Sequence, residues 1–221
     1  LVKCLTGLMK SESGKISILG KKVDHQDPRM ITELGTAHIP EDRQKDGLIL
    51  QNPVKYNLIM NTYFKEPFSK GIVLQPEAIN KNAERLVKDF DIRTPGIDVP
   101  VSVLSGGNQQ KVIVAREFSR PIKLLIAAQP TRGLDVGSIE YIHERLIEKR
   151  DQGCGVLLVS TELDEVMQLA DRISVMFRGK LLATIDADKV TKKEIGLLMA
   201  GIETKISSKK RRPQKIREII T

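Results

Sequence analysis

Residues 104–111 read Leu-Ser-Gly-Gly-Asn-Gln-Gln-Lys and carry more information about the fold than any other stretch of the chain. Ser105 is a residue type favoured at the N-cap of a helix, and the two glycines after it leave the first-turn N–H groups open to an anion. The positive end of the helix dipole favours a phosphate there. A serine followed by two glycines is also typical of an ordinary polar turn, so the interpretation depends on the neighbouring segments.

The segment that follows predicts a buried strand and then a polar turn. Residues 124–128 are all apolar, and residues 129–135 read Gln-Pro-Thr-Arg-Gly-Leu-Asp. Strands are also predicted at 15–19, 36–39, 155–160, 172–177 and 181–185, the last after a turn at 178–180. Helices are predicted at 1–9, 28–33, 54–62, 76–89, 106–119, 138–151, 163–169 and 192–200. This alternation predicts an α/β core with a mainly parallel sheet that is flanked by helices and buried on both faces.

Together these landmarks resemble the ATP-binding cassette (ABC) transporter ATPases over nearly the whole chain, and most closely the second cassette of tandem importers of simple sugars or nucleosides. Residues 104–111 resemble the family's signature motif, and Ala128-Gln129-Pro130 stands at its Walker B Asp-Glu-Pro. Gly133-Leu134-Asp135 resembles its D-loop. Glu41 occupies the Q-loop position, and Thr161 the switch-histidine position.

The resemblance implies a P-loop NTPase-like core at residues 1–53 and 104–204, with an inserted helical subdomain at 54–103. In the family, two cassettes meet head to tail, and the signature of one closes over the ATP that the phosphate loop of the other holds. The expected contacts to ATP held by the partner cassette, in the same polypeptide or in a homodimer, come from Ser105, Gly106, Gly107 and Gln109. The resemblance also implies transmembrane permease subunits as partners, at the cytoplasmic side of the cell membrane.

Two of these positions also have an ordinary structural interpretation. Gln109 is equally expected as an exposed polar residue of the helix. Asp135 is expected to contact the partner cassette, and its position also suits an N-cap for the helix predicted at 138–151.

The catalytic positions depart from the family's pattern. The Walker B Asp, which orients Mg²⁺, is replaced by Ala128, and the Glu that polarises the attacking water is replaced by Gln129. The methyl group of Ala128 cannot coordinate Mg²⁺ or its bound waters, and the neutral amide of Gln129 cannot accept a proton from the attacking water. The hydroxyl of Thr161 is no acid or base near neutral pH. We therefore predict that ATP and Mg²⁺ act in the complete transporter, that this half hydrolyses ATP weakly, and that it holds no metal.

No Gly-x-x-x-x-Gly-Lys-Ser/Thr motif occurs in the chain. The apolar pattern of Leu1, Leu5 and Leu8 resembles the helix that directly follows the phosphate loop in the family. We therefore predict a chain that is N-terminally truncated after the Walker A loop and that binds ATP poorly by itself.

Composition agrees with a globular domain. The chain has 221 residues, of which 40% are hydrophobic and 29% charged, and no apolar run approaches the roughly 18 residues that a membrane-spanning helix needs. Cys4 and Cys154 lie far apart, which predicts buried thiols in a reducing compartment. His38 and His143 have no second ligand at a spacing typical of metal sites.

The net charge of +8 is concentrated in residues 205–221, which carry seven basic side chains and one acidic side chain. Such a run predicts a solvated, disordered tail. Binding to anionic lipid is the alternative. Nucleic acid is not expected as a partner, because three Tyr, five Phe and no Trp offer few stacking surfaces.

Two other classes of function remain open from the sequence. One is a noncatalytic module in which bound nucleotide stabilises an assembly, which the altered Walker B favours. The other is a soluble ABC-type ATPase of translation or DNA repair, which the short segment between Glu41 and Val103 disfavours because it leaves no room for a long coiled-coil insertion.

Overall fold

A parallel sheet organises the first of two units into which the chain divides, Leu1–Val159 and the part from Ser160 onward. Its strand order is β3 (Thr36–Ile39), β6 (Leu124–Ala128) and β7 (Gly155–Val159). The strands pair in parallel register, so their carboxyl ends lie at one edge of the sheet. The computed structural model describes residues 1–24 and 27–202, so the predicted tail at 205–221 lies outside the described residues.

Burial differs between the strands of this sheet. Leu125, Ile126 and Ala127 of β6 are 0% exposed, as are Ala37 and Ile39 of β3. Residues 156–159 of β7, at one edge of the described sheet, are only half-buried. The predicted burial on both faces is confirmed for β6 and is wrong for β7.

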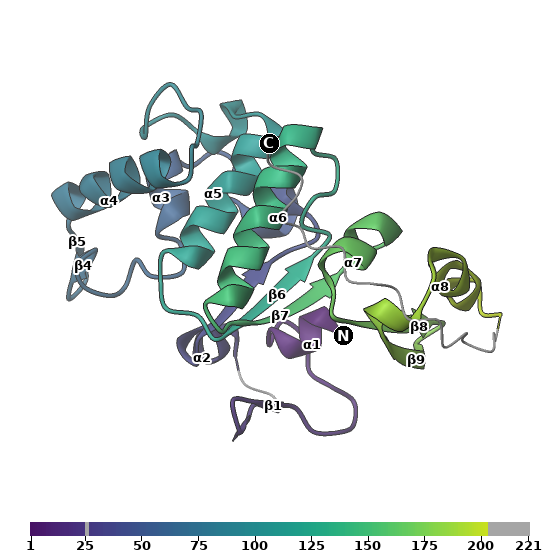
Figure 1. Cartoon of the computed structure of the whole chain (residues 1–221). Coiled ribbons are helices and arrows are strands. Elements are labelled where there is room, and N and C mark those ends of the chain that lie inside the picture. The colour runs from purple at the N-terminus through teal and green to yellow at the C-terminus, as the bar shows by residue number, and fades with distance from the viewer. Residues whose placement is uncertain (25–26, 203–221) are drawn as a thin grey trace. The chain divides into compact units, whose positions relative to one another are not determined.

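Two long helices cover the sheet. The helix α5 (Gly106–Phe118) contacts β3, and α6 (Val136–Asp151) contacts β7. Figure 1 shows α5 and α6 side by side, and the two helices are in contact. The shorter α2 (Pro28–Glu33), whose N-cap Asp27 accepts a hydrogen bond from Met30 N, also contacts β3. The predicted α/β layering is therefore confirmed.

The first twenty residues differ from the prediction. The helix expected at 1–9 is only α1 (Val2–Leu5), because Gly7 takes a left-handed backbone with φ +76° that a helix does not continue through. The strand expected at 15–19 is β1 (Ser17–Ile18), which pairs antiparallel with β2 (Lys21–Lys22) instead of joining the parallel sheet. Leu19 and Gly20 have φ of 51° and 77° and form the tight turn between them.

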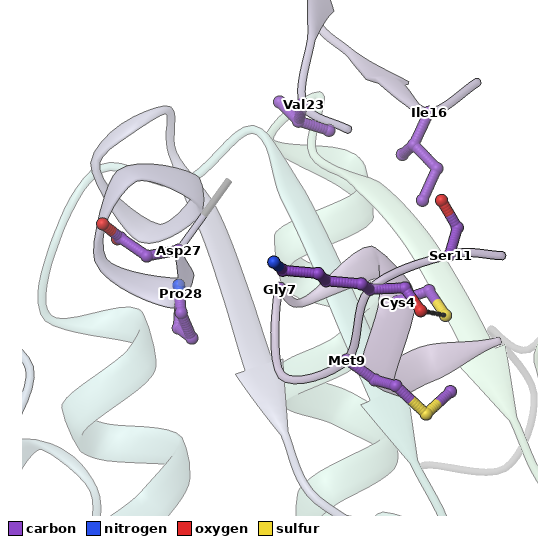
Figure 2. A pocket seen from close by; sticks show the side chains of 9 residues that line it. Cys4, Gly7, Met9, Ser11, Ile16, Val23, Asp27 and Pro28 are labelled. Carbon is purple, nitrogen blue, oxygen red and sulfur yellow. Dashed lines mark hydrogen bonds between the residues drawn. The ribbon is translucent and has the colours of Figure 1, made fainter. Parts of the chain in front are cut away.

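A cavity of about 210 Å³ lies among α1, the β1–β2 hairpin and the start of α2 (Figure 2). Cys4, Met9 and Ile16 are among the residues that line it, and none of the predicted site residues does. The Cys4 thiol is half-buried and not fully buried as expected, whereas Cys154 is buried and the burial raises its pKa. Both cysteines are free.

The segment between residues 54 and 103 packs against α5. It contains α3 (Val54–Leu58), the hairpin β4 (Ser69–Lys70) and β5 (Val73–Leu74), α4 (Pro76–Asp89), and one 3₁₀ turn, η2 (Val101–Val103). Helix α3 contacts α4 and α5, so this segment supports the helix that begins with the signature-like stretch. The first helix is shorter than the predicted 54–62, since the chain continues from Ile59 as hydrogen-bonded turns.

The second unit has a core of its own. It comprises α7 (Leu163–Leu169), β8 (Arg172–Phe177), β9 (Lys180–Asp186), η3 (Ala187–Lys189) and α8 (Lys192–Met199). The strands β8 and β9 form the predicted antiparallel hairpin, because Arg178 and Gly179 have φ of 46° and 78° and close a two-residue turn. The buried core residues are Ile173, Val175, Ile185, Val190, Ile195 and Leu198.

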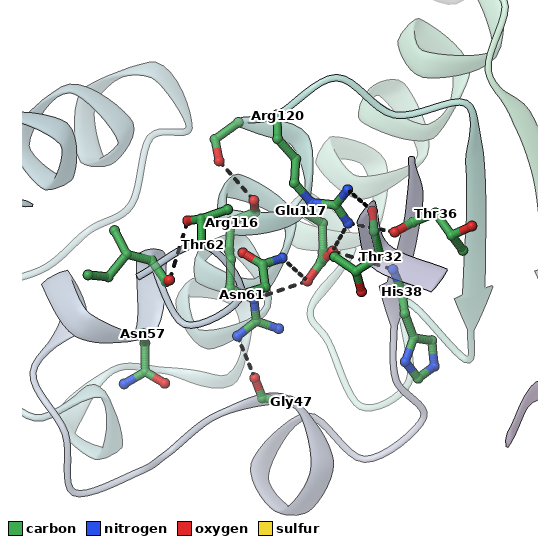
Figure 3. Close-up of polar contacts among 12 residues, drawn as sticks. Thr32, Thr36, His38, Gly47, Asn57, Asn61, Thr62, Arg116, Glu117 and Arg120 are labelled. Carbon is green, nitrogen blue, oxygen red and sulfur yellow. Dashed lines mark hydrogen bonds and ion pairs between the residues drawn. The ribbon is translucent and has the colours of Figure 1, made fainter. Parts of the chain in front are cut away.

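A buried charged cluster holds the C-terminal half of α5 in place (Figure 3). The Glu117 carboxylate accepts hydrogen bonds from Arg116 Nε at 3.0 Å and from Arg120 Nη2 at 3.1 Å. It also accepts bonds from Asn61 Nδ2 at 3.2 Å and from the backbone N–H of His38 at 3.4 Å. The exposed fraction of the Glu117 side chain is 7%, so the carboxylate has protein donors in place of water.

The two guanidinium groups of this cluster extend it to the backbone of other elements. Arg116 Nη1 donates to the carbonyl of Gly47 at 2.8 Å. Arg120 donates to the carbonyls of Thr36 at 2.6 Å and Thr32 at 3.2 Å. The cluster thereby ties α5 to β3, to α2 and to the loop after β3. The partial burial of His38 on β3 lowers the pKa of its imidazole, although the nearby Glu117 carboxylate acts in the opposite direction.

Candidate functional site at the carboxyl edge of the sheet

Two predicted positions, Glu41 and Gln129, lie at the carboxyl edge of the parallel sheet. Glu41 comes two residues after the end of β3, and Gln129 comes directly after β6. Arg132 Nη1 donates to Glu41 Oε1 at 3.1 Å, and this ion pair joins the two loops. Both side chains are largely exposed, at 67% and 61%, so the pair contributes about 1 kcal/mol or less.

Gln129 has a left-handed backbone, with φ of 48°. For a residue with a side chain this conformation costs about 1–2 kcal/mol. The N–H of Gln129 donates to the carbonyl of Val159 at 2.7 Å, which continues the ladder between β6 and β7 by one residue. The polar turn after β6 therefore begins at a fixed point, and Ala128 before it is 5% exposed.

The side chains at this edge do not fit Mg²⁺. Mg²⁺ is held by carboxylates and other oxygen ligands, and the side chain of Ala128 is a methyl group without an oxygen. Gln129 offers a neutral amide, and the Glu41 carboxylate is already paired with Arg132. Across residues 1–24 and 27–202, no three His, Cys, Asp or Glu side chains lie close enough together to hold a metal ion. No metal-dependent step follows for these residues.

The start of α5 has the predicted cap. Ser105 has an extended backbone, and its Oγ accepts hydrogen bonds from Asn108 N at 3.4 Å and Asn108 Nδ2 at 3.0 Å. Ser105 is exposed, Gly106 is half-buried and Gly107 is buried. The surface open to a ligand at this helix start is therefore formed by Ser105 and Gly106, and the hydroxyl hydrogen of Ser105 remains available to donate.

Gly107 lies against the start of α6. A Cβ at Gly107 would stand 2.2 Å from Ser138 Oγ and 3.3 Å from Asp135 Oδ2. Asp135 is the N-cap of α6, as predicted: its Oδ1 accepts from Ser138 N at 2.9 Å and its Oδ2 from Ser138 Oγ at 2.7 Å. These bonds from Ser138 lower the pKa of Asp135. The signature-like stretch and the D-loop-like turn thus form one continuous surface.

We expect Gly107→Ala to destabilise the chain by about 1–3 kcal/mol, the usual cost of overpacking. The new methyl group would have to displace Ser138, whose Cβ stands 3.1 Å from its position as well. Urea unfolding would measure the change. Adding Ser138→Gly should recover part of the loss because it removes both close atoms, and a double variant no more stable than Gly107→Ala would contradict the proposed clash.

Gln109 lies elsewhere than the sequence suggests. It is 2% exposed, and its Nε2 donates to the carbonyl of Leu104 at 3.1 Å. Its Oε1 accepts from Gln44 Nε2 at 3.0 Å. The expected exposed position is wrong, because α5 is covered on this side by the loop after β3. Buried in this way, the side chain has no surface from which to contact a partner's nucleotide.

Gln110 is a site residue that the sequence did not indicate. It is 2% exposed, and its Nε2 donates to the carbonyl of Pro130 at 2.7 Å. The bond joins α5 to the turn after β6. Gln110 directly follows Gln109 on the helix, and two adjacent polar residues do not indicate from the sequence which of them faces the turn after β6. Only the packing of α5 reveals this contact.

Arg43 also contributes a contact between the loops of this site. It begins η1 (Arg43–Gly47), a single π-helical turn after β3, and its Nη1 donates to the carbonyl of Arg132 at 2.7 Å. Its Nη2 is 2.7 Å from the position of a Cβ at Gly106. This bond joins the loop after β3 to the turn after β6.

The first unit therefore brings together Glu41, Gln129, Ser105, Gly106 and Asp135 through consecutive contacts. Thr161 belongs to the second unit, where it is exposed and follows Ser160, whose Oγ accepts a hydrogen bond from Glu162 N at 3.0 Å. Its assignment to the switch position stays a prediction.

More than half of the chain matches a known protein family. A family described as ABC transporter matches residues 1–132. The chain belongs to the ABC transporter family. The matched region includes the signature-like stretch 104–111, Ala128–Pro130 and Glu41, whereas Gly133–Asp135 and Thr161 lie beyond it.

Two curated relatives of this ABC protein are named import ATP-binding proteins. It is 48% identical over 209 residues to a guanosine import ATP-binding protein of Bacillus subtilis, covering 95% of this chain and 41% of the relative. It is 50% identical over 201 residues to a nucleoside import ATP-binding protein of Lactococcus lactis, covering 91% of this chain and 40% of the relative. The chain thus spans about two fifths of the length of these relatives.

Solved structures confirm the ABC ATPase fold. A dimeric ATP-binding cassette in a post-hydrolysis state with ADP and phosphate superposes with a TM-score of 0.70 at 21% identity, covering 84% of this chain and 78% of that chain. Within the described parts of the ABC protein, no helix is long and apolar enough to cross a membrane.

Proposed function

We propose that this chain is the nucleotide-binding domain of an ABC importer and couples ATP binding and hydrolysis to the uptake of nucleosides. The relatives named for guanosine and nucleoside import are 48% and 50% identical to it. A glucose import ATP-binding protein of Haloferax volcanii is 37% identical, covering 91% of this chain and 37% of the relative. This difference favours nucleosides over simple sugars as the solute.

One observation carries the proposed role of the domain. The exposed Ser105 and the half-buried Gly106 start α5 beside Asp135, while the turn after β6 offers the methyl group of Ala128 and the neutral amide of Gln129 and no carboxylate at these two positions. The domain therefore supplies its signature to a site whose ATP is held mainly by a partner cassette. This arrangement also supports the tandem assignment, because the matched two fifths of each relative leaves room for a second cassette.

In this role the chain's own groups bind and orient the partner's ATP. The Ser105 hydroxyl and the N–H of Gly106 donate to γ-phosphate oxygens, and the helix dipole stabilises their negative charge. Asp135, fixed by Ser138, contacts the opposite cassette. The complete assembly includes transmembrane permease subunits, and the domain lies at the cytoplasmic side of the membrane.

The test is ATP hydrolysis by the full-length ATPase reconstituted with its permease subunits in lipid vesicles. We expect guanosine on the binding side to raise ATP turnover severalfold more than ribose or glucose does. Stimulation by a sugar alone would contradict the nucleoside assignment. The second candidate function is a noncatalytic module in which bound nucleotide stabilises the assembly, which Ala128 and Gln129 support because neither side chain carries a charge. The absence of ATP hydrolysis in the intact assembly would favour this candidate.

A further inference from the structure

We propose that Arg43 is a positioning residue that holds the D-loop-like turn, Gly133–Asp135, in place relative to the start of α5. The inference rests on the proposed role of Ser105 and Gly106 in contacting the partner's ATP. It adds that Arg43 aligns these residues with Asp135, the residue proposed to contact the partner cassette. Its basis is the short hydrogen bond, 2.7 Å, from Arg43 Nη1 to the carbonyl of Arg132.

The guanidinium group of Arg43 lies between two glycines. Its Nη2, Cζ and Nε stand 2.7, 3.4 and 3.6 Å from the position of a Cβ at Gly106, so it occupies the space that any side chain there would need. Its Nη2 is also 3.8 Å from the corresponding position at Gly133, where φ is +67°. The flat group therefore fills the space between the signature-like stretch and the D-loop-like turn.

The backbone that carries Arg43 is fixed on α5. The Asp42 carboxylate accepts hydrogen bonds from the N–H groups of Gln44 and Lys45, both at 3.0 Å, and caps η1. At the other end of η1, a Cβ at Gly47 would stand 2.6 Å from Ile113 Cδ1 of α5, so the two elements are in close contact. The contact between η1 and α5 thus fixes where the Arg43 side chain starts relative to α5.

Backbone hydrogen bonds hold together the turn at residues 129–134, which contains the carbonyl of Arg132. Arg132 N donates to the carbonyl of Gln129 at 3.1 Å, and Leu134 N to that of Thr131 at 3.1 Å. Fixing the carbonyl of Arg132 therefore fixes the turn that leads to Asp135.

Helix stability does not account for this placement of a cation. A positive charge near a helix N-terminus is unfavourable because the helix dipole is positive there. The Nε of Arg43 is also buried without a hydrogen-bond partner among the described residues, which adds a desolvation cost. The arrangement is therefore explained better by alignment of two functional segments than by stability.

The test compares variants of the full-length ATPase, reconstituted with its permease subunits. We expect Arg43→Gln to lower kcat for ATP about tenfold, as for the loss of one charge-assisted hydrogen bond, and to change KM for ATP less than about twofold because the partner's phosphate loop holds the nucleotide. Arg43→Lys should fail to restore kcat, because an ammonium group does not span both contacts. Lys45→Gln is the matched control: it removes an exposed charge from the same turn and should leave kcat unchanged.

Each outcome separates this inference from the proposed function. A wild-type kcat in Arg43→Gln, together with inactivity in Ser105→Arg, would overturn the role of Arg43 and leave the signature role intact. Full activity in Arg43→Lys would show that charge alone matters and would overturn positioning as well. Activity retained in Ser105→Arg would contradict the proposed function itself. Equal melting temperatures of the variants would exclude a folding defect, and a kcat loss that follows a lower melting temperature would count against positioning.

Discussion

Ser105→Arg is expected to lower ATP turnover by the reconstituted transporter at least about 100-fold, which corresponds to about 2.7 kcal/mol in activation free energy. The exposed Ser105 side chain and the half-buried Gly106 form the open surface at the start of α5. An arginine side chain there would extend into the space that the triphosphate needs. ATP hydrolysis at saturating nucleotide would measure the loss.

The loss of the helix cap needs a control, because Ser105 Oγ accepts from Asn108 N and its replacement alone costs about 1 kcal/mol. Ser105→Asp keeps a capping oxygen and adds a charge of the same sign as the phosphates. We expect it to be as stable as the wild type and as inactive as Ser105→Arg. Ser105→Gly removes the hydroxyl without bulk or charge, costs a few tenths of a kcal/mol in stability, and should reduce turnover less than about tenfold.

These three variants separate phosphate contact from helix stability. If turnover followed the melting temperature, with Ser105→Asp active, the start of α5 would serve only as a cap and the proposed signature role would be wrong. If Ser105→Asp were stable and inactive, the surface would face an anion during turnover.

Helix caps could be predicted from the sequence because they are local. Ser105 and Asp135 each bond to a residue three positions later, so the residue type and its place before a helix were sufficient. The parallel strands β3, β6 and β7 were also predictable, since an apolar run between helices has few other solutions. The hairpin of the second unit followed from Arg178-Gly179 in the same way.

Side-chain contacts between distant segments could not be predicted. Arg43 and Arg132 are 89 positions apart, and Gln110 and Pro130 are 20 apart, so nothing in the local sequence pairs them. Gln109 was expected at a surface because its type is polar, yet packing by the loop after β3 buried it. The turn at Leu19-Gly20 was missed for a different reason: Leu19 is an apolar residue with a positive φ, which is uncommon.

Glu117→Leu is expected to destabilise the chain by about 3–5 kcal/mol, because it leaves two buried guanidinium groups without their carboxylate. The side chains of Arg116 and Arg120 are only 5% and 13% exposed, so water does not replace the lost partner. Urea unfolding of the purified chain would measure the change. Glu148→Ala is the matched control: Glu148 pairs with Arg145 at 2.9 Å on α6 but is 52% exposed, and its loss should cost less than about 1 kcal/mol.

The cause of this destabilisation can be tested with a second substitution. If the cost comes from unpaired buried charge, adding Arg120→Met to Glu117→Leu should recover stability, because one of the two unpaired cations is removed while volume is kept. If the cost came from the lost attraction alone, the double variant would be no more stable than Glu117→Leu. Recovery would show that the unpaired buried charge, and not the lost attraction, causes the destabilisation. A loss greater than that of Glu117→Leu would show instead that Arg120 stabilises the position of α5 through its bonds to the carbonyls of Thr32 and Thr36.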